Sequence, residues 1–279
     1  MELIEDSDVN EKRLISCTSF APKKLFYAPH IQSQINRLAD LLQPEQFKNV
    51  TERLSKNGMR KGFACLFYGS PGTGKTETVN QLARVTGRDV LMVDVSQIKS
   101  CWVGESEKNI KATFDRYRKL VKEREVAPIL LFNEADAVLG IRQEGAERAV
   151  DKMENSIQNI ILQEMETLEG IMIATTNLTC NLDKAFERRF IYKIEFERPT
   201  TEAKKQIWKT MIPALSEDFA YSLAKEFDLS GGQIENVARK RTVEFILSGN
   251  EPSEQQIREY CKGEMLNSKQ EKRAKIGFN

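Results

Sequence analysis

An apolar run that ends in acidic and amide side chains has the composition of a site that holds a metal ion and activates water. The sequence ILLFNEADAVLG spans residues 129–140; its apolar run ends at Asn133 and Glu134, and Asp136 follows. A carboxylate at the carboxyl end of a buried strand is well placed to act as a general base. Two carboxylates would suggest a bound metal ion, but the first polar position is an amide. The sequence therefore raises the question of whether Glu134 acts in hydrolysis or in binding alone.

The segment GSPGTGKT, residues 69–76, matches the pattern G-x-x-x-x-G-K-[ST] of a phosphate-binding loop. It follows a predicted strand and precedes a predicted helix, which is the context that the motif requires. Glycines let successive N–H groups point at phosphate oxygens, and the helix N-terminus adds partial positive charge. Lys75 can reach the β- and γ-phosphates, and the Thr76 hydroxyl can ligate Mg²⁺. The segment predicts a nucleoside triphosphate site.

Short apolar runs alternate along the chain with segments long enough to form helices. The runs occupy residues 63–68, 90–95, 128–132, 171–176 and 192–196. Most of these runs are continuously apolar, which is typical of strands that are buried on both faces. Strands that alternate with helices predict an α/β domain built on a parallel sheet.

The pattern changes near Pro199, after which no strand-like run occurs. Helices are expected at residues 201–212, 216–228, 231–248 and 253–265. Two of them begin with capping-box spacing, Ser230-x-x-Gln233 and Ser253-x-x-Gln256. We therefore predict a flexible N-terminal arm (1–20), an α/β nucleotide-binding domain (21–198), a helical domain (199–266) and a C-terminal tail (267–279).

Charge and composition argue against several functional classes. The 42 basic and 41 acidic residues leave a net charge of +1, which does not favour nucleic acid or an anionic membrane as the main partner. His30 is the only histidine, so the chain has no H-E-x-x-H zinc site and no histidine-based triad. Five separated cysteines fit reduced thiols, no apolar run reaches the ~20 residues that span a bilayer, and the N-terminus lacks a signal-peptide pattern. We expect a cytoplasmic protein without membrane contact.

Together with the phosphate loop, four segments resemble the AAA+ ATPases, and in particular the classic AAA clade. They are GESEKNI (104–110), LLFNEAD (130–136), ATTN (174–177) and AFERRF (185–190), and the resemblance runs from Leu25 to Lys262. It implies a three-layer P-loop NTPase fold, with a five-stranded parallel sheet of order 5-1-4-3-2 and a small all-helical lid domain. It also implies ATP and Mg²⁺ bound between the domains, and rings, usually hexamers, with composite active sites.

The resemblance assigns roles to four residues. Glu134 matches the catalytic glutamate that polarises the attacking water, in agreement with its place after an apolar strand. Asn177 matches the polar residue that orients this water and senses the γ-phosphate. Arg188 and Arg189 match the region of the arginine fingers, which act on the ATP of a neighbouring subunit. Many relatives separate these arginines by Pro-Gly, so which of the two acts stays open, and a surface pair in salt bridges is the alternative.

The resemblance also implies which residues bind ATP and which bind Mg²⁺. The residues expected at ATP are Ser70, Pro71, Gly72, Thr73, Gly74, Lys75, Thr76, Glu77 and Gly232, and those expected at Mg²⁺ are Thr76 and Asn133. Asn133 departs from the family, whose strand ends in Asp-Glu. An amide retains an oxygen acceptor but lacks the charge of a carboxylate. We expect weaker Mg²⁺ binding but retained hydrolysis, because Glu134 is present, and we interpret Asp136 as a local cap.

Other segments resemble the parts of the family that contact a substrate or sense the nucleotide. SCWVGESEKNI resembles the first pore loop, so Trp102 and Val103 are expected to grip a translocating polypeptide; the alternative is a tryptophan in the core. Residues 140–150 resemble a second pore loop. Glu235 stands where some clades place a sensing arginine, and Arg239 is either a substitute for it or a solvated side chain.

The sequence therefore predicts an Mg²⁺-dependent ATPase that remodels or unfolds a protein client as a homo-oligomeric ring, with a hexamer expected. The alternative is an ATP-gated assembly or binding module with little or no hydrolysis. A nucleic-acid motor is disfavoured by the near-zero net charge and by the lack of a basic helical appendage. The client, the biological process and the ring size are not evident from the sequence.

Overall fold

The computed structural model describes residues 14–95, 105–141, 149–178 and 182–265, and it divides into two compact units. The α/β unit consists mainly of Ser33–Ser70 and Lys75–Phe196. The helical unit begins at Glu197 and also includes Lys24–Gln32 and Pro71–Gly74. The division after Phe196 lies close to the domain boundary predicted at residue 198. Within the described ranges, no helix is long and apolar enough to cross a membrane.

The α/β unit is built on a sheet whose six described strands have the order β1–β3–β4–β5–β2–β6. All neighbouring pairs are parallel except β1 and β3. The five parallel strands, numbered along the chain, have the predicted order 5-1-4-3-2, and the predicted α/β fold is confirmed. The strands are β1 (Leu14–Ile15), β2 (Phe63–Gly69), β3 (Val90–Asp94), β4 (Ile129–Asn133), β5 (Ile171–Thr176) and β6 (Tyr192–Phe196).

The edge strand β1 has no counterpart in the sequence pattern. Leu14 and Ile15 pair antiparallel with β3, and the Cys17 N–H donates to Asp89 Oδ1 at 3.0 Å. The assignment of residues 1–20 to a flexible arm is therefore corrected for residues 14–17, which are bonded to the sheet edge. A strand of two residues is too short to show a periodic pattern.

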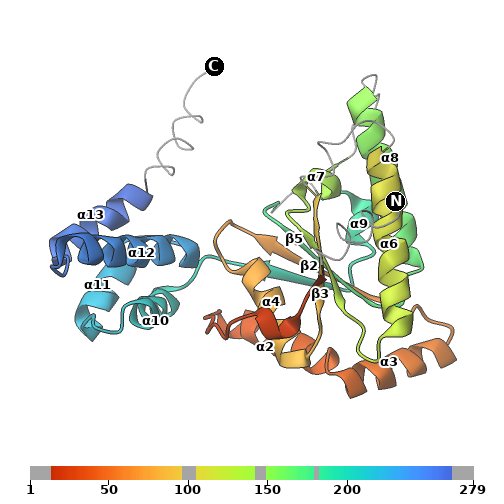
Figure 1. Cartoon of the computed structure of the whole chain (residues 1–279), viewed down its shortest axis with the longest axis horizontal. Helices are drawn as coiled ribbons and strands as arrows, with labels where there is room; N and C mark the ends of the chain where they lie inside the picture. The colour runs from red at the N-terminus through yellow and green to blue at the C-terminus, as the bar shows by residue number, and fades with distance from the viewer. Residues whose placement is uncertain (1–13, 96–104, 142–148, 179–181, 266–279) are drawn as a thin grey trace, which may run out of the picture. The chain divides into compact units, whose positions relative to one another are not determined.

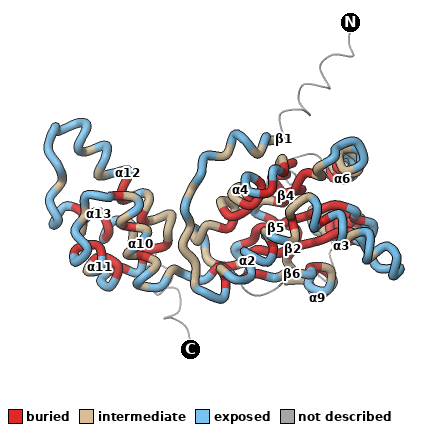
Figure 2. The backbone as a smooth tube through the Cα atoms, turned by 90° about the horizontal axis from the view of Figure 1, so that it is seen from below, coloured by how far each residue is buried: buried red, intermediate tan, exposed pale blue. Residues whose placement is uncertain are grey.

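Helices cover both faces of the sheet (Figure 1). On one face lie α6 (Glu105–Glu123) and α8 (Ala149–Glu166), which share a core with alternate strand residues such as Leu66 and Phe132. On the other face lies α4 (Lys75–Thr86), with Val79 and Leu82 buried. Figure 2 shows the central strands buried and the outer sides of the helices exposed. This double covering explains why the central strands β2, β4 and β5 are nearly continuous apolar runs, whereas the edge strand β6 alternates buried residues with exposed Lys193 and Glu195. The other helical elements described before residue 197 are η1 (Cys17–Ser19), α2 (Pro29–Leu41), α3 (Pro44–Lys56), α7 (Asp136–Leu139) and α9 (Lys184–Glu187).

Among the described residues after Glu197, four helices lie at the positions predicted from the sequence: α10 (Thr201–Met211), α11 (Glu217–Glu226), α12 (Gly231–Ser248) and α13 (Glu254–Glu264). Ser230 and Ser253 cap α12 and α13, and both predicted capping boxes are present. Trp208 is fully buried in the core of this unit. These helices therefore have a hydrophobic core of their own.

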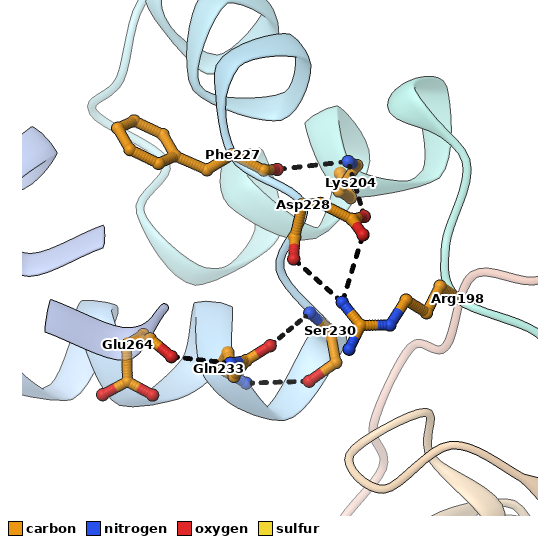
Figure 3. Close-up of polar contacts among 7 residues, drawn as sticks. All are labelled: Arg198, Lys204, Phe227, Asp228, Ser230, Gln233 and Glu264. Atoms are coloured by element: carbon orange, nitrogen blue, oxygen red, sulfur yellow. Dashed lines mark hydrogen bonds and ion pairs between the residues drawn. The ribbon is translucent and has the colours of Figure 1, made fainter. Parts of the chain in front are cut away.

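A polar network orders the segment that precedes α12 (Figure 3). The Lys204 ammonium donates to the Phe227 carbonyl at 3.1 Å and lies 3.5 Å from the Asp228 carboxylate. Arg198 Nη1 donates to the carbonyl and the carboxylate of Asp228 at 3.0 and 3.1 Å. At the start of α12, Gln233 Nε2 donates to the Glu264 carbonyl at 2.9 Å. These contacts fix the loop that leads to the N-terminus of α12.

Candidate functional site

The carboxyl ends of three adjacent strands bring the predicted site residues of the α/β unit together. β4, β5 and β2 are consecutive in the sheet and parallel, so their carboxyl ends lie at the same edge. Ser70 follows β2, Glu134 follows β4, and Asn177 follows β5. This edge is where ligands bind in open parallel α/β sheets.

The phosphate loop ends where α4 begins, at Lys75. Gly72 and Gly74 have φ angles of +74° and +93°, which only glycine adopts without strain. The Lys75 ammonium donates to the carbonyls of Gly69 and Ser70 at 2.8 Å each, and to Asn177 Oδ1 at 2.9 Å. The phosphate lysine is thus in direct contact with the residue predicted to sense the γ-phosphate.

Burial controls the protonation of Lys75. The residue is 7% exposed, and burial lowers the pKa of its ammonium from 10.5 to about 8, while the Asp136 carboxylate acts in the opposite direction. At neutral pH the side chain is therefore charged and able to pair with phosphate oxygens. It is also closer to losing its proton than an exposed lysine is.

This pKa predicts a pH dependence of ATP binding. A bound phosphate raises the pKa of the lysine, so the complex keeps a proton that the free protein loses above pH 8. The dissociation constant for ATP should be nearly constant up to pH 7.5 and weaken about tenfold by pH 9. Titration with a fluorescent ATP analogue at a fixed free Mg²⁺ concentration measures it. Lys75→Arg is the control, because a guanidinium stays charged throughout this range; the same slope in both proteins would contradict the assignment.

Asn133, at the end of β4, is held by two hydroxyl groups. Thr76 Oγ1 donates to Asn133 Oδ1 at 2.8 Å, and Thr175 Oγ1 donates to the same oxygen at 3.0 Å. The amide thus takes the place expected of a carboxylate beside the α4 threonine. The sequence pattern does not single out Thr175, whose role depends on the register between β4 and β5.

The oxygens of Thr76 and Asn133 fit the outer part of a Mg²⁺ site. Mg²⁺ prefers oxygen ligands and is commonly held by one or two side chains together with substrate phosphates and water. Within the described ranges, no cluster of three or more His, Cys, Asp or Glu side chains could hold a metal by itself. The phosphates of the nucleotide would therefore supply most of the negative charge among the ligands of a magnesium ion at this place.

Glu134 occupies a strained turn between β4 and α7. Its φ angle is +52°, and it is the one non-glycine residue with positive φ among those that the structure describes. Its N–H donates to Thr175 Oγ1 at 3.2 Å, and its side chain is exposed at the sheet edge. Such backbone conformations carry a cost of the order of 1–3 kcal/mol and occur preferentially at functional sites. The turn points a carboxylate away from the core, where it can meet water.

Asp136 does not cap its own helix. The N-cap position of α7 is Ala135, and it has no side-chain cap. The Asp136 carboxylate instead accepts hydrogen bonds from the Thr176 hydroxyl and from the Asn177 N–H, the latter at 2.8 Å. The interpretation of Asp136 as a local cap is therefore wrong, because its partners are the last residue of the adjacent strand β5 and the residue that follows it.

The two adjacent arginines have different surroundings. Arg189 Nη1 donates to the Ala185 carbonyl at 2.8 Å, and Arg189 Nη2 pairs with Glu166; the side chain is 19% exposed. Arg188 is exposed and makes no ion pair with any residue that the structure describes. Ile191, three residues later, is 58% exposed. Arg188 is therefore available for a partner, whereas Arg189 is used within its own chain.

The remaining predicted positions lie elsewhere or outside the described ranges. Glu77 accepts from Gln81 Nε2 at 2.8 Å on α4. Gly232 is the second residue of α12, and its N–H donates to the Gly72 carbonyl at 3.0 Å; both residues belong to the helical unit. Trp102 and Val103, as well as most of the second predicted pore loop, lie outside the described residues.

Comparison with known proteins gives matches over much of the chain. The model of the ATPase family associated with various cellular activities (AAA) matches residues 65–198, from β2 through β6. Protein CdcH of Halobacterium salinarum is 34% identical over 208 residues, which cover 71% of this chain and 27% of that protein. The proteasome-associated ATPase of Thermobifida fusca is 32% identical over 202 residues (65% and 33%). Protein SUPPRESSOR OF K(+) TRANSPORT GROWTH DEFECT 1 of Arabidopsis thaliana is 31% identical over 182 residues (61% and 40%). The chain thus spans well under half the length of these relatives.

Proposed function

The chain carries a domain of the AAA ATPase family, and on that premise we propose that it binds ATP with Mg²⁺ and hydrolyses it to ADP and phosphate. The convergence of Lys75, Thr76, Asn133, Glu134 and Asn177 at one edge of the sheet carries this proposal. These residues supply a charge for the phosphates, oxygen ligands for a metal ion, a carboxylate and a polar group that orients water.

Each of these residues has its own role in the proposed hydrolysis. Lys75 pairs with the β- and γ-phosphates, and Mg²⁺ supplies charge neutralisation on the phosphate oxygens when it is bound. Glu134 accepts the proton of a water molecule whose oxygen attacks the γ-phosphorus, while the bond to the bridging oxygen of ADP breaks. Asn177 orients this water through its amide. Arg188 is proposed to stabilise the charge on the γ-phosphate of a neighbouring subunit.

We further propose that the chain forms a homo-oligomeric ring, expected to be a hexamer, which remodels a protein client. Arg188 and the apolar Ile191, three residues apart in the sequence, are both exposed, which supports an intersubunit surface. A protein client is supported by the name of the Thermobifida fusca relative, which associates it with a proteasome. In this proposal Trp102 and Val103 contact the client.

A second candidate is an ATP-gated module that binds ATP and assembles but turns over little. The observation that favours it is the neutral Asn133 beside Thr76, since the loss of a carboxylate weakens the hold on Mg²⁺. Retention of Glu134 favours hydrolysis over this alternative.

The test measures ATP turnover and molecular mass together over a range of protein concentrations, with Mg²⁺ present. We expect turnover per subunit to rise as the mass increases from monomer to ring, because each site needs its neighbour. Assembly and ATP binding without turnover would favour the gated module. A mass that stays monomeric at every concentration with ATP would contradict both the ring and the role of Arg188 in trans.

A further inference from the structure

Asp136 lies near Glu134 and Asn177, the two residues proposed to act on the attacking water. It follows Glu134 by one intervening residue, and its carboxylate reaches across to the end of β5. There it accepts from the Asn177 N–H at 2.8 Å and from the hydroxyl of the buried Thr176. Asn177 in turn accepts from the Lys75 ammonium. A continuous chain of contacts therefore runs from the Glu134 turn to the phosphate lysine.

The Glu134 turn is attached to β5 at successive positions. The Glu134 N–H donates to Thr175 Oγ1 at 3.2 Å, and the Ala135 N–H donates to the Thr175 carbonyl at 2.8 Å. The Asp136 carboxylate extends this attachment past the last strand residue to Asn177. Asn177 follows Thr176, the last residue of β5 in the register with β2, so it lies just beyond the paired part of the strand. Asp136 accepts from its N–H, and Lys75 donates to its side chain, so Asp136 is the contact that holds its backbone.

One oxygen of Asp136 makes both contacts. Oδ1 accepts from the hydroxyl and from the N–H together, an arrangement that a carboxylate or an amide oxygen can satisfy. The negative charge of Asp136 also acts on Lys75, where it opposes the loss of the proton that burial favours. Asp136 thus has two separate effects: its Oδ1 accepts hydrogen bonds, and its negative charge acts on Lys75. Different substitutions of Asp136 can distinguish these effects.

We propose that Asp136 is a positioning residue that holds Asn177 against Lys75 and at a fixed place relative to Glu134. This inference rests on the proposed ATP hydrolysis. The carboxylate does not touch ATP in this role, and it acts through the Asn177 backbone. A displaced Asn177 would leave ATP bound by the phosphate loop but would misorient the attacking water, and displacements of about 1 Å can cost roughly 10²-fold in rate.

Two substitutions at Asp136 separate geometry from charge. Asp136→Asn keeps an acceptor oxygen at the same place and removes the charge. Asp136→Glu keeps the charge and moves the oxygens by one methylene. Asp40→Glu, on the exposed side of α2, is the matched control. Each variant is examined by hydrogen exchange at the Asn177 amide, by the dissociation constant of an ATP analogue and by kcat for ATP.

Asp136→Asn is expected to keep the exchange rate of the Asn177 amide and kcat within about threefold of wild type. Asp136→Glu should accelerate that exchange at least about tenfold and lower kcat about 10²-fold, with the dissociation constant changed by less than about threefold. Wild-type exchange and kcat in Asp136→Glu would overturn the proposal, and so would equal losses in both variants. If wild type shows no turnover, the proposed hydrolysis fails, and the exchange rates alone decide whether Asp136 positions Asn177.

Discussion

Glu134→Gln is expected to lower ATP turnover by about 10²- to 10⁴-fold, the range typical of a missing general base. Glutamine preserves the shape of the side chain and the strained turn at φ +52°, but it does not accept a proton from water. Because the proposed contacts of Lys75 with phosphate and of Thr76 with Mg²⁺ are untouched, ATP binding should change by less than about threefold. Phosphate release and equilibrium binding of an ATP analogue, measured on the same protein, separate the two effects.

Asn133, next to Glu134, allows the opposite substitution, from an amide to a carboxylate, as a control. Asn133→Asp restores a carboxylate at the position that accepts from Thr76 and Thr175. It should preserve turnover at saturating Mg²⁺ and reduce the Mg²⁺ concentration needed for half-maximal turnover by about tenfold or more. Turnover that survives in Glu134→Gln would remove this glutamate from the mechanism. An unchanged Mg²⁺ requirement in Asn133→Asp would show that Asn133 is remote from the metal ion.

The fold was predictable to the extent that its elements leave a periodic or continuous pattern. Buried parallel strands are apolar throughout, and the capping boxes at Ser230 and Ser253 specify where helices begin. The strand β1 escaped prediction because two residues form no pattern, and its pairing with β3 depends on the register of a distant segment. Local sequence patterns therefore predicted the helices and the parallel strands. The edge strand β1 was not predicted, because it depends on a long-range pairing.

The site residues differ in the same way: those in local motifs were predicted, and those defined by contacts between strands were not. The motifs predicted that Lys75, Thr76 and Glu134 belong together, because their spacing is tied to a loop and to a strand end. Thr175 and Asp136 were missed or misinterpreted, since their partners lie on neighbouring strands and sequence distance does not reveal them. The choice between Arg188 and Arg189 was likewise open, because burial and the pairing of Arg189 with Glu166, which favour Arg188, are not visible in the sequence.

Arg188→Ala is expected to reduce turnover by about 10³-fold, the lower range of the loss seen when an arginine finger is removed. The guanidinium is exposed and has no ion pair among the described residues, so its loss should leave the stability of the subunit unchanged. Arg189→Ala is the matched control. It removes the contacts to Ala185 and Glu166, so it should cost about 1 kcal/mol or less in the free energy of unfolding, with a much smaller effect on turnover. Turnover and thermal unfolding of both variants test this assignment.

Mixed rings decide whether Arg188 acts on a neighbour. Arg188→Ala subunits retain Glu134, and Glu134→Gln subunits retain Arg188, so neither protein alone hydrolyses ATP at the wild-type rate. In a ring with head-to-tail interfaces, an Arg188→Ala site beside a Glu134→Gln neighbour receives both groups. Random mixing of equal amounts should then restore up to about a quarter of wild-type turnover. If mixing restores nothing although the rings exchange subunits, Arg188 acts within its own chain or not at all, because complementation requires the two groups to come from different subunits.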